Sequence, residues 1–521
     1  MARCTALLLT ALAFAAAEAA PTPGPVAQWR SAHEHSLLQE YLPFLELPNV
    51  ATDRAAIDRV AEALVVLMQR RGLQPRRLRL DDADVPPLVV GEWTVPGATE
   101  TLVFYAHYDG QPVTPEDWSG DPWVPWLYDP RSGAPVALEQ GRPIDPEWRI
   151  RARGAADDKA GVMVLLWAID ALRASGIEPR VNVRLLFEGE EEQGSPHLAQ
   201  LLARHREVLG PHPWIIADGP RHASGRMQVV FGVRGDANVE LTTYGARRPL
   251  HSGHYGNWAP NPALAMATLL ASMKDADGHV VVADWHQDEV PLAAHERDAL
   301  AAVPQADEAL RRELGLGRVE YPALGLLEAT SRASLNINGV RAGDVGAQAS
   351  NVIPTIARAT LDLRLGKGQT PQRQYTKLLA HVRGQGFHVL GRDPTDAERL
   401  EHPRIVRMEL LPGAYPASRT AMDAPFAQRV VAAVQSVSPE PVIRLPTLGG
   451  SLPLAVVNEV LGAPTLIVPI SNHDNNQHAE DENIRLGNLW DGIAIYAAIM
   501  AHPHSASEPA ASAGAAPGAA R

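Results

Sequence analysis

The chain has 521 residues, of which 45% are hydrophobic, and this length is enough for two or more domains with their own cores. Its formal net charge of −13 argues against a surface that binds nucleic acid, so no nucleic-acid partner is expected. With one cysteine, Cys4, the chain cannot form a disulfide framework.

The first 20 residues have the pattern of a secretory signal peptide. Arg3 precedes an apolar stretch from Ala6 to Ala17, and the small residue Ala19 suits a cleavage site. We therefore expect export to the periplasm or secretion, and a mature chain without cysteine. The alternative is an uncleaved, buried N-terminal helix. This segment is too short to span a bilayer, and no membrane span is expected after its removal.

The next part of the chain alternates predicted strands and helices. Strands are predicted at 100–109, 180–189 and 212–219, and an amphipathic helix at 159–176 that ends at Gly176. This order is typical of an α/β fold with a mostly parallel sheet and helices on both faces.

The pattern changes after Gly235. Residues 236–245 and 359–365 alternate as half-buried antiparallel strands do, with a helical pattern around 375–383. The α/β pattern then returns with a helix at 424–437 and a strand at 463–470. We therefore predict an α/β domain in two parts that carries an inserted α+β domain, and a disordered tail. The predicted segments are 27–235 and 419–504 for the α/β domain, 236–418 for the insertion and 505–521 for the tail.

The stretch from Phe187 to Pro196 holds four carboxylates in five positions. A solvated acidic turn is the simplest explanation of such a run. However, this run follows an apolar strand, and residues at the carboxyl end of a strand are where α/β proteins place their sites. A bound cation would relieve the repulsion between adjacent carboxylates. For Glu188 and Glu190 we find no chemical role, and solvent exposure is the favoured interpretation.

Histidine and aspartate side chains also fall where other predicted strands end. Each alone has an ordinary explanation, because an aspartate before a helix is often an N-cap and an Asp-Gly pair is often a turn. Together they mix imidazole and carboxylate groups at one edge of a sheet, which suits zinc, or manganese or cobalt in its place. These candidates are His107, Asp109, Asp157, Asp158, Asp218, His473 and His478.

Eight short motifs occur in an order known from one family: AHYDGQP, RGAADDKAG, EGEEEQGS, IIADG, HSGHYGNWAPNP, NVIP, GGSLP and NNQHAEDE. With these motifs the chain resembles the co-catalytic zinc metallopeptidases of the carnosinase, carboxypeptidase G and succinyl-diaminopimelate desuccinylase family, peptidase family M twenty. The resemblance extends from about Ala27 to His502, and DGQP and DDK are most similar to the carnosinase-type dipeptidases. It implies a zinc-peptidase fold whose inserted domain serves as a lid and in dimerisation.

The resemblance implies two divalent metal ions per chain, zinc being expected and manganese or cobalt the alternatives. It assigns His107 and Asp218 to one ion, Glu192 and His478 to the other, and Asp157 to both. His473 is a rival to His478, but QHAEDE matches the family motif better.

The resemblance also implies roles for residues beside the ions. Glu191 is expected to be the general base, and Asp109 to orient His107, since a fixed tautomer makes a better ligand. His251 is expected to stabilise the oxyanion. In dimeric relatives this histidine comes from the partner subunit, so a homodimer is expected. Arg364 is expected to bind a substrate carboxylate, and Gly450 and Ser451 to contact the substrate.

Some features depart from the family pattern. Alanine stands at 106, 152 and 160, where the family often has glycine. The stretch 124–148 is longer than expected and leaves one rim of the site undefined. A second histidine of the inserted domain cannot be placed, and Arg419 lies in that region with an open role.

By the same resemblance, aspartate at position 218 goes with aminopeptidases and dipeptidases. We therefore predict cleavage of the amide bond of dipeptides or short peptides with a free N-terminus. The alternatives are an N-acyl-amino-acid deacylase or carboxypeptidase of the same family and, more remotely, a non-catalytic peptide-binding relative. Two domains also suggest hinge closure around the substrate, near Gly235 and Ser418.

Overall fold

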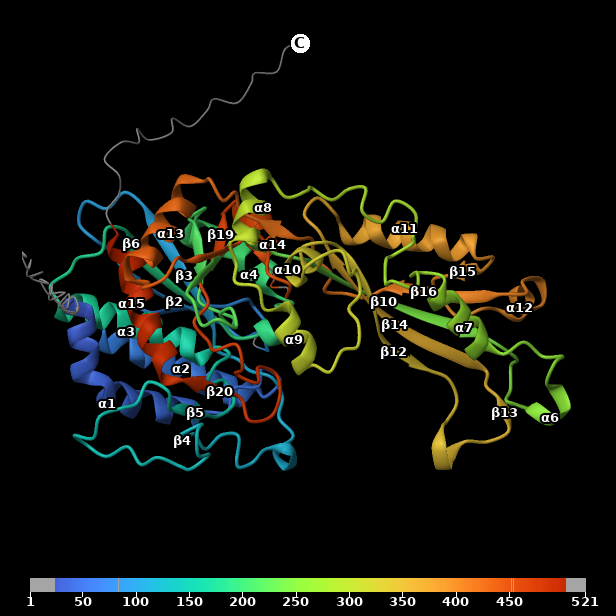
Figure 1. Cartoon of the computed structure of the whole chain (residues 1–521), viewed down its shortest axis with the longest axis horizontal. Helices are drawn as coiled ribbons and strands as arrows, with labels where there is room; N and C mark the ends of the chain where they lie inside the picture. The colour runs from blue at the N-terminus through green and yellow to red at the C-terminus, as the bar shows by residue number, and fades with distance from the viewer. Residues whose placement is uncertain (1–23, 83, 451, 453, 503–521) are drawn as a thin grey trace, which may run out of the picture.

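The structure is a computed structural model that describes residues 24–82, 84–450, 452 and 454–502. It contains two large sheets. Figure 1 shows the first sheet and its helices at one end of an elongated molecule and the second sheet at the other. The predicted signal peptide (1–20) and the predicted tail (505–521) lie outside the described residues.

The eight-stranded sheet, called the main sheet below, is mixed. In spatial order the strands are β1 (Arg76–Leu78), β2 (Leu88–Trp93), β6 (Asn182–Glu188), β3 (Thr101–His107), β7 (Trp214–Ile216), β19 (Thr465–Ile467), β8 (Gln228–Val230) and β18 (Ile443–Leu445). The central strands β6, β3, β7 and β19 run parallel, β1, β2 and β6 are joined by antiparallel pairs, β19 pairs antiparallel with β8, and β18 pairs parallel with β8. This arrangement confirms the predicted α/β fold.

Helices cover both faces of the main sheet. Successive side chains of a strand point to opposite faces, so each buried strand contributes apolar side chains to the core on either side. In β3, Phe104 packs into one apolar cluster and Val103 and Tyr105 into the other. The first cluster contains α1 (Pro25–Leu45), α2 (Arg54–Arg70), α3 (Lys159–Ala174), α13 (Pro425–Val437) and α15 (Leu486–Ala501). The second contains α4 (Leu198–Arg204) and α14 (Leu454–Leu461), with α5 (Arg206–Leu209) contributing Leu209.

Helix α3 is buried over most of its length and packs against both α1 and α15. Asp158 caps its N-terminus, since the carboxylate accepts a hydrogen bond from the backbone N–H of Gly161 at 3.1 Å. The helix ends at Ala174, and Gly176 follows with φ +67°, as expected for a glycine that terminates a helix. The predicted end of this helix is therefore confirmed.

The five-stranded sheet, called the second sheet, is antiparallel except for its last pair. Its apolar face packs against α7 (Pro262–Ala271) and α11 (Pro371–Gly384). The alternation predicted for two of its strands is present as alternating burial. In spatial order the strands are β12 (Ser334–Arg341), β14 (Ile356–Leu365), β10 (Gly235–Tyr244), β16 (Ile405–Leu410) and β15 (His388–Leu390).

The chain passes between the two sheets through a narrow neck, where β9 (Gly232–Val233) pairs with β17 (Ser418–Arg419). A further contact lies outside this neck. Helix α8 (Ala294–Ala301), which comes between strands of the second sheet in the sequence, packs against β18 of the main sheet. The domain boundaries at 235/236 and 418/419 stay a prediction, although both fall at the neck.

A small three-stranded sheet lies beside the main sheet. It consists of β4 (Trp126–Tyr128), β5 (Arg149–Arg151) and β20 (Asn483–Arg485), with β5 in the middle. The unexpected stretch 124–148 thus supplies β4 and the loop that leads to β5. Shorter elements complete the chain: β11 (Leu250–His251), α6 (Ser252–Tyr255), α9 (Asp307–Glu313), α10 (Leu326–Thr330), β13 (Val352–Ile353) and α12 (Asp396–Glu401). Among the described residues, no helix has the length and apolar character needed to cross a membrane.

Candidate metal centre

Five of the predicted site residues meet at one edge of the main sheet. His107 is the last residue of β3, Glu192 follows β6, and Asp218 follows β7. Asp157 lies in the loop before α3, and His478 lies between β19 and β20. Because parallel strands end at the same edge of a sheet, residues far apart in the sequence come together there.

Asp157 lies at the centre of this cluster. Its Oδ1 is 2.8 Å from Nε2 of His107, and its Oδ2 is 3.1 Å from Nε2 of His478. The same His478 nitrogen is 3.3 Å from Oε2 of Glu192. Each oxygen of one carboxylate therefore faces a different imidazole, as a bridging ligand between two metal positions would.

Asp218 faces His107 from another side. Its Oδ2 is 3.8 Å from Nε2 of His107, and its Oδ1 is buried without a hydrogen-bond partner among the described residues. Such an orphaned oxygen is uncommon in a protein interior, and a cation bound there would satisfy it. Imidazole nitrogens and carboxylate oxygens form a donor set that suits zinc, and this set fits the metal pair implied by the sequence motifs.

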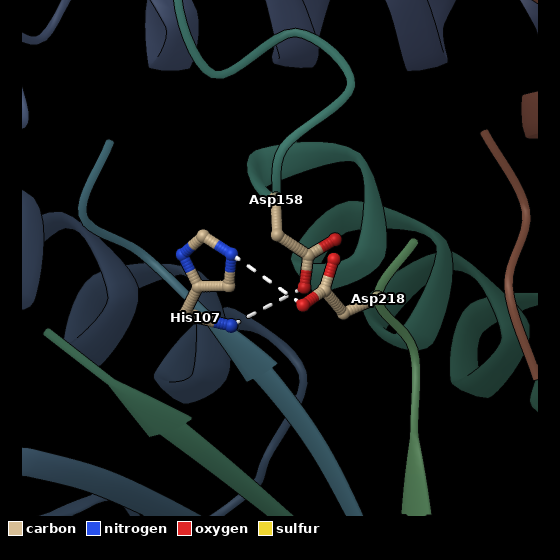
Figure 2. A group of neighbouring side chains, drawn as sticks. All are labelled: His107, Asp158 and Asp218. Atoms are coloured by element: carbon tan, nitrogen blue, oxygen red, sulfur yellow. Dashed lines mark hydrogen bonds and ion pairs between the residues drawn. The ribbon is translucent and has the colours of Figure 1, made fainter. Parts of the chain in front are cut away.

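Asp158 lies in the same place but has other contacts. Figure 2 shows the carboxylates of Asp158 and Asp218 side by side, facing the ring and the backbone nitrogen of His107. The Asp158 carboxylate accepts hydrogen bonds from the backbone N–H of His107, at 3.2 Å, and of Gly161. Its contacts are thus those of a helix cap that also anchors the end of β3, and Asp157 is the aspartate that faces both histidines.

The carboxylates at this edge differ in their pKa values. Burial alone would raise the pKa of Asp157, but hydrogen bonds to His107 and His478 outweigh it and hold the pKa below the ordinary value. Burial, followed by repulsion from Asp157, raises the pKa of Glu192 to about 8 and that of Asp218 to about 6. Burial also raises the pKa of Glu191, to which the charges of Asp218 and Glu192 add. Divalent cations would compensate this crowded negative charge.

Asp109 contacts both His107 and the glutamate segment. Nδ1 of His107 lies 3.1 Å from the backbone carbonyl oxygen of Asp109 and 3.4 Å from its carboxylate. The same carboxylate accepts hydrogen bonds from the backbone N–H groups of Glu191, at 3.1 Å, and Glu192, at 3.0 Å. Asp109 is therefore placed to fix the ring of His107 and the two neighbouring glutamates together.

The interpretation of Glu188 and Glu190 as solvent-exposed residues is wrong. Glu188 is fully buried, and its carboxylate accepts a hydrogen bond of 2.7 Å from the hydroxyl of Tyr105. Glu190 is 3% exposed and accepts a hydrogen bond of 2.9 Å from the backbone N–H of His197. Since Glu188 is the last residue of a buried strand, its burial was implied by the apolar run before it.

Two residues near the cluster carried no assignment from the sequence. Glu482 is fully buried, and its carboxylate accepts hydrogen bonds of 2.7 to 2.9 Å from the backbone N–H groups of Gly154, Ala156 and Asp157. Gln111 donates a hydrogen bond of 2.8 Å to Oε2 of Glu192. Gln111 lies inside the motif AHYDGQP, and Glu482 lies inside the motif NNQHAEDE. The motifs therefore identified these segments but not the roles of the two residues.

The predicted substrate-binding residues lie outside the cluster. His251 is exposed and directly precedes α6, which Figure 1 places at the far end of the second sheet, away from β3. Arg364 lies in β14 and pairs with Asp362 at 3.0 Å and Asp236 at 3.4 Å. Gly450 is exposed, and Ser451 lies outside the described residues.

A cavity of about 1150 Å³ lies between the second-sheet segment and the main-sheet domain. Its wall includes His222 and His473 on the side of the main sheet and Lys367 and Arg419 on the other. His473, the rival ligand, thus lines this cavity. Arg419 pairs with Glu296 of α8 at 3.3 Å.

A model of peptidase family M20/M25/M40 matches residues 103–502 of the chain. The chain therefore belongs to this family and is a metallopeptidase.

Its relatives include two dipeptidases. The Cys-Gly metallodipeptidase of Saccharomyces cerevisiae is 24% identical over 440 residues, which cover 82% of this chain and 84% of that protein. The Beta-Ala-His dipeptidase of Homo sapiens is 23% identical over 424 residues, covering 80% and 77%.

Among solved structures, a metallo-carboxypeptidase from Sulfolobus solfataricus matches with a TM-score of 0.74 and 24% identity, over 89% of this chain and 98% of that one. Human carnosine dipeptidase 1 matches with a TM-score of 0.72 and 20% identity, over 92% and 99%. These likenesses support the fold.

Proposed function

We propose that this metallopeptidase hydrolyses the amide bond of dipeptides or short peptides that have a free N-terminus, with two divalent metal ions per chain. The observation that carries the proposal is the position of Asp157, whose two oxygens face His107 and His478 separately. His107 and Asp218 would hold one ion, and Glu192 and His478 the other. The nitrogen and oxygen donor set favours zinc over manganese or cobalt.

When bound, the two ions supply Lewis acidity, which polarises the scissile carbonyl and lowers the pKa of a water molecule. The other chemistry belongs to the chain. Oε2 of Glu191 lies 4.0 Å from Nε2 of His107, so this carboxylate lies beside the proposed position of the first ion. Glu191 accepts the proton of the attacking water and delivers it to the leaving amine. Its raised pKa suits a group that must hold a proton between these two steps.

The preference for dipeptides rests on the relatives and on the cavity. The two relatives described above are named for the dipeptides Cys-Gly and Beta-Ala-His. The cavity between the second-sheet segment and the main-sheet domain has Lys367, Arg419 and His473 in its lining. Since Arg419 already pairs with Glu296, Lys367 is the cation of this cavity that would suit the terminal carboxylate of a short peptide. Arg364 remains the clamp that the family resemblance implies.

The experiment is metal analysis and hydrolysis on one purified sample of the mature chain. We expect about two zinc ions per chain, and release of amino acids from a dipeptide panel that stops on chelation and returns with zinc. Turnover of N-acyl amino acids alone would favour the deacylase alternative, and cleavage of N-blocked peptides alone the carboxypeptidase. Metal binding without hydrolysis of any of these would favour a peptide-binding relative.

The proposal includes a homodimer in which His251 serves the active site of the partner subunit. Within one chain His251 precedes α6, which lies at the end of the second sheet away from β3 (Figure 1), and a second copy is the proposed way to bring it to a metal centre. The alternative is closure of the inserted domain over the metal centre of its own chain. Large apolar side chains are exposed on the second-sheet segment, among them Trp258 at 79%, Leu264 at 69% and Val340 at 56%. Val340 belongs to β12, the edge strand of the second sheet, and a partner could cover this edge.

Export is the last part of the proposal. The motif in residues 1–20 and the absence of cysteine from the remaining sequence suit an oxidising compartment outside the cytoplasm. Expression of the full chain followed by N-terminal sequencing of the extracellular or periplasmic protein tests this, and a cytoplasmic product that retains Met1 would contradict it.

A further inference from the structure

Three arginines in β5 and just after it pair with the segment that carries His478. Arg149 and Arg151 lie two residues apart in β5, so their side chains share one face while Ile150 between them is fully buried. Arg153 continues the same spacing just beyond the strand. We call Arg149, Arg151 and Arg153 the arginine ladder, and the segment 472–482 the His478 loop.

Each arginine of the ladder pairs with a different carboxylate of the His478 loop. The nearest nitrogen–oxygen distances are 2.7 Å for Arg149 and Asp474, 3.1 Å for Arg151 and Asp481, and 2.9 Å for Arg153 and Glu482. The ladder thus holds the loop at both ends. Each pair joins residues more than 320 positions apart in the sequence.

Arg153 also holds the loop beside the metal-binding residue itself. Its Nη2 donates a hydrogen bond of 3.1 Å to the backbone carbonyl of Ala479, the residue directly after His478. Its partner Glu482 accepts a hydrogen bond of 2.9 Å from the backbone N–H of Asp157. One buried ion pair therefore connects the loop of His478 with the loop of the bridging aspartate.

Tryptophan rings restrict the arginines in turn. The guanidinium of Arg151 lies 4.1 Å from the ring centre of Trp126, and that of Arg153 lies 5.0 Å from the ring centre of Trp118. Trp126 belongs to β4, which the stretch 124–148 supplies. The hydroxyl of Ser119 also donates a hydrogen bond to Asp481. The stretch 124–148, which the sequence left without a role, thus supports the ladder through Trp126, and Trp118 and Ser119 just before it add to this support.

The His478 loop needs such support because of its backbone. Three of its residues other than glycine have left-handed φ angles: Asn476 at 55°, His478 at 64° and Asp481 at 56°. These conformations are disfavoured for residues with a side chain and persist where surrounding contacts fix them. The side chain of His478 is 54% exposed, whereas those of Asp157 and Glu192 are 4% and 5% exposed. Packing alone therefore does not hold His478 in place.

We propose that the arginine ladder positions His478 for the second metal ion, and that Arg149 and Arg151, whose carboxylate partners both belong to the His478 loop, set the affinity of that site more than that of the His107–Asp218 site. The proposal rests on the proposed two-metal centre. The ladder residues are positioning residues, because they act through the loop. Groups that orient a metal ligand typically change metal affinity by about 10- to 100-fold when they are removed.

The test is zinc binding by the metal-free enzyme and its variants Arg149→Met and Arg151→Met. Methionine keeps an unbranched side chain but removes the charge and the donors. Zinc per chain is measured by elemental analysis after equilibrium dialysis over a range of free zinc. Arg131→Met is the matched control, because Arg131 pairs with Asp129 and Asp145 of the same stretch and contacts no residue of the loop in any described interaction.

In the wild type and in Arg131→Met we expect two zinc ions with unchanged affinities. In the ladder variants we expect one site to lose at least about 10-fold in affinity and the other site to change less than about twofold. Amide hydrogen exchange supplies a readout without metal: the N–H groups of Ala479 and Asn483, bonded to carbonyls of Asn476 and Asn475, should exchange faster in the metal-free ladder variants.

Unchanged zinc affinity at both sites in the ladder variants would overturn the proposal. An equal loss of zinc affinity at both sites would also overturn it, because neither result would locate the effect at the His478 loop. If a ladder variant does not fold, Asp474→Asn removes the exposed partner of Arg149 and should weaken the same site. Where both variants fold, the loss of zinc affinity in the double variant should be smaller than the sum of the losses in Arg149→Met and in Asp474→Asn. A wild type that binds fewer than two ions would instead contradict the proposed metal centre, so the two failures are distinguishable.

Discussion

Two adjacent glutamates, Glu191 and Glu192, have different surroundings although they share one short turn. The side chain of Glu192 lies next to His478 and Gln111, whereas that of Glu191 faces His107. Asp109 fixes the backbone of both through their N–H groups. One residue can therefore bind a cation while its neighbour remains free to exchange a proton, and adjacency in the sequence keeps the two groups at one centre.

This division of roles predicts the behaviour of Glu191→Gln. We expect the turnover of a dipeptide to fall about 10²- to 10⁴-fold, because the amide cannot accept a proton, while the zinc content stays at the wild-type value. Steady-state hydrolysis and elemental analysis on the same preparation measure both. Glu190→Gln is the control, since Glu190 bonds to His197 and should matter for stability more than for turnover. Wild-type turnover in Glu191→Gln would rule out the proposed mechanism.

Asp236, at the start of the second sheet, provides a test of pH dependence. Burial raises the pKa of Asp236 to about 6 and a hydrogen bond with Asp362 adds to this, although Arg364 opposes it. The folded chain therefore keeps a proton on Asp236 between about pH 4 and pH 6, where the unfolded chain has released it. The stabilisation from this group is complete below about pH 4 and is lost as the pH rises through about 6.

Asp236→Asn has no proton to lose at this position. The free energy of unfolding of the wild type should therefore fall by about 1–2 kcal/mol relative to that of Asp236→Asn as the pH rises from 4.5 to 7.5. This range allows for the partial exposure of the Asp236 carboxyl group. Urea denaturation of both proteins at several pH values measures this difference. A difference that stays constant over this range would contradict the assignment.

At the scale of elements, the close approach of α3 to the main sheet depends on Gly161. A Cβ atom at this position would lie 2.7 Å from the backbone oxygen of Ala217, which directly precedes Asp218. It would also lie 2.3 Å from Oδ1 of Asp158, the cap of the helix. The glycine is therefore required by the packing of the helix against the strand end that carries a predicted metal ligand.

This packing predicts opposite effects for two glycine-to-alanine changes. Gly161→Ala should lower the free energy of unfolding by about 1–3 kcal/mol, because the helix or the strand end must move. Gly384→Ala, in the last turn of α11 where a Cβ meets nothing within 4 Å, should raise it by up to about 1 kcal/mol. Thermal or urea denaturation decides this, and a stabilised Gly161→Ala protein would show that the predicted clash is absent.

Local patterns in the sequence predicted the central strands, helix α3 and the cluster of histidine and carboxylate side chains that follow strand ends, whose metal-binding roles stay a prediction from the family resemblance. Apolar periodicity and cap residues are local, so they can be found without a structure. The contacts of the arginine ladder could not be found in this way, because Arg153 and Glu482 are 329 residues apart and each alone resembles a surface charge. The burial of Glu190 depends on His197 in a later turn, which the glutamate run does not reveal.

At the scale of the whole molecule, the remote position of His251 predicts that inactive subunits complement each other. In a mixed dimer of Glu191→Gln and His251→Ala, one active site has an intact Glu191 and receives an intact His251 from its partner. Random pairing of the two variants should therefore restore about a quarter of the wild-type activity. Co-expression with two different tags and purification through both isolates the mixed dimer for assay.

Two outcomes would contradict this arrangement. Mixed dimers that are no more active than the separate variants would show that His251 does not act across an interface. A monomer in sedimentation that keeps full activity would exclude a partner's contribution altogether. Measuring turnover at several protein concentrations links the two experiments, because dissociation should lower the activity per chain.

The contact between α8 and β18 has a mechanical consequence. The neck of β9 and β17 is two strands wide and by itself would let the two ends of the molecule bend and twist about it. Helix α8 belongs in sequence to the second-sheet segment yet is seated on the main sheet, so it forms a second point of attachment. Two bodies joined at two separate places keep fewer degrees of freedom than two bodies joined at one. Any swing between the ends must therefore stretch the segments on either side of α8 or lift the helix from the sheet, and the stiffness of these segments limits its range.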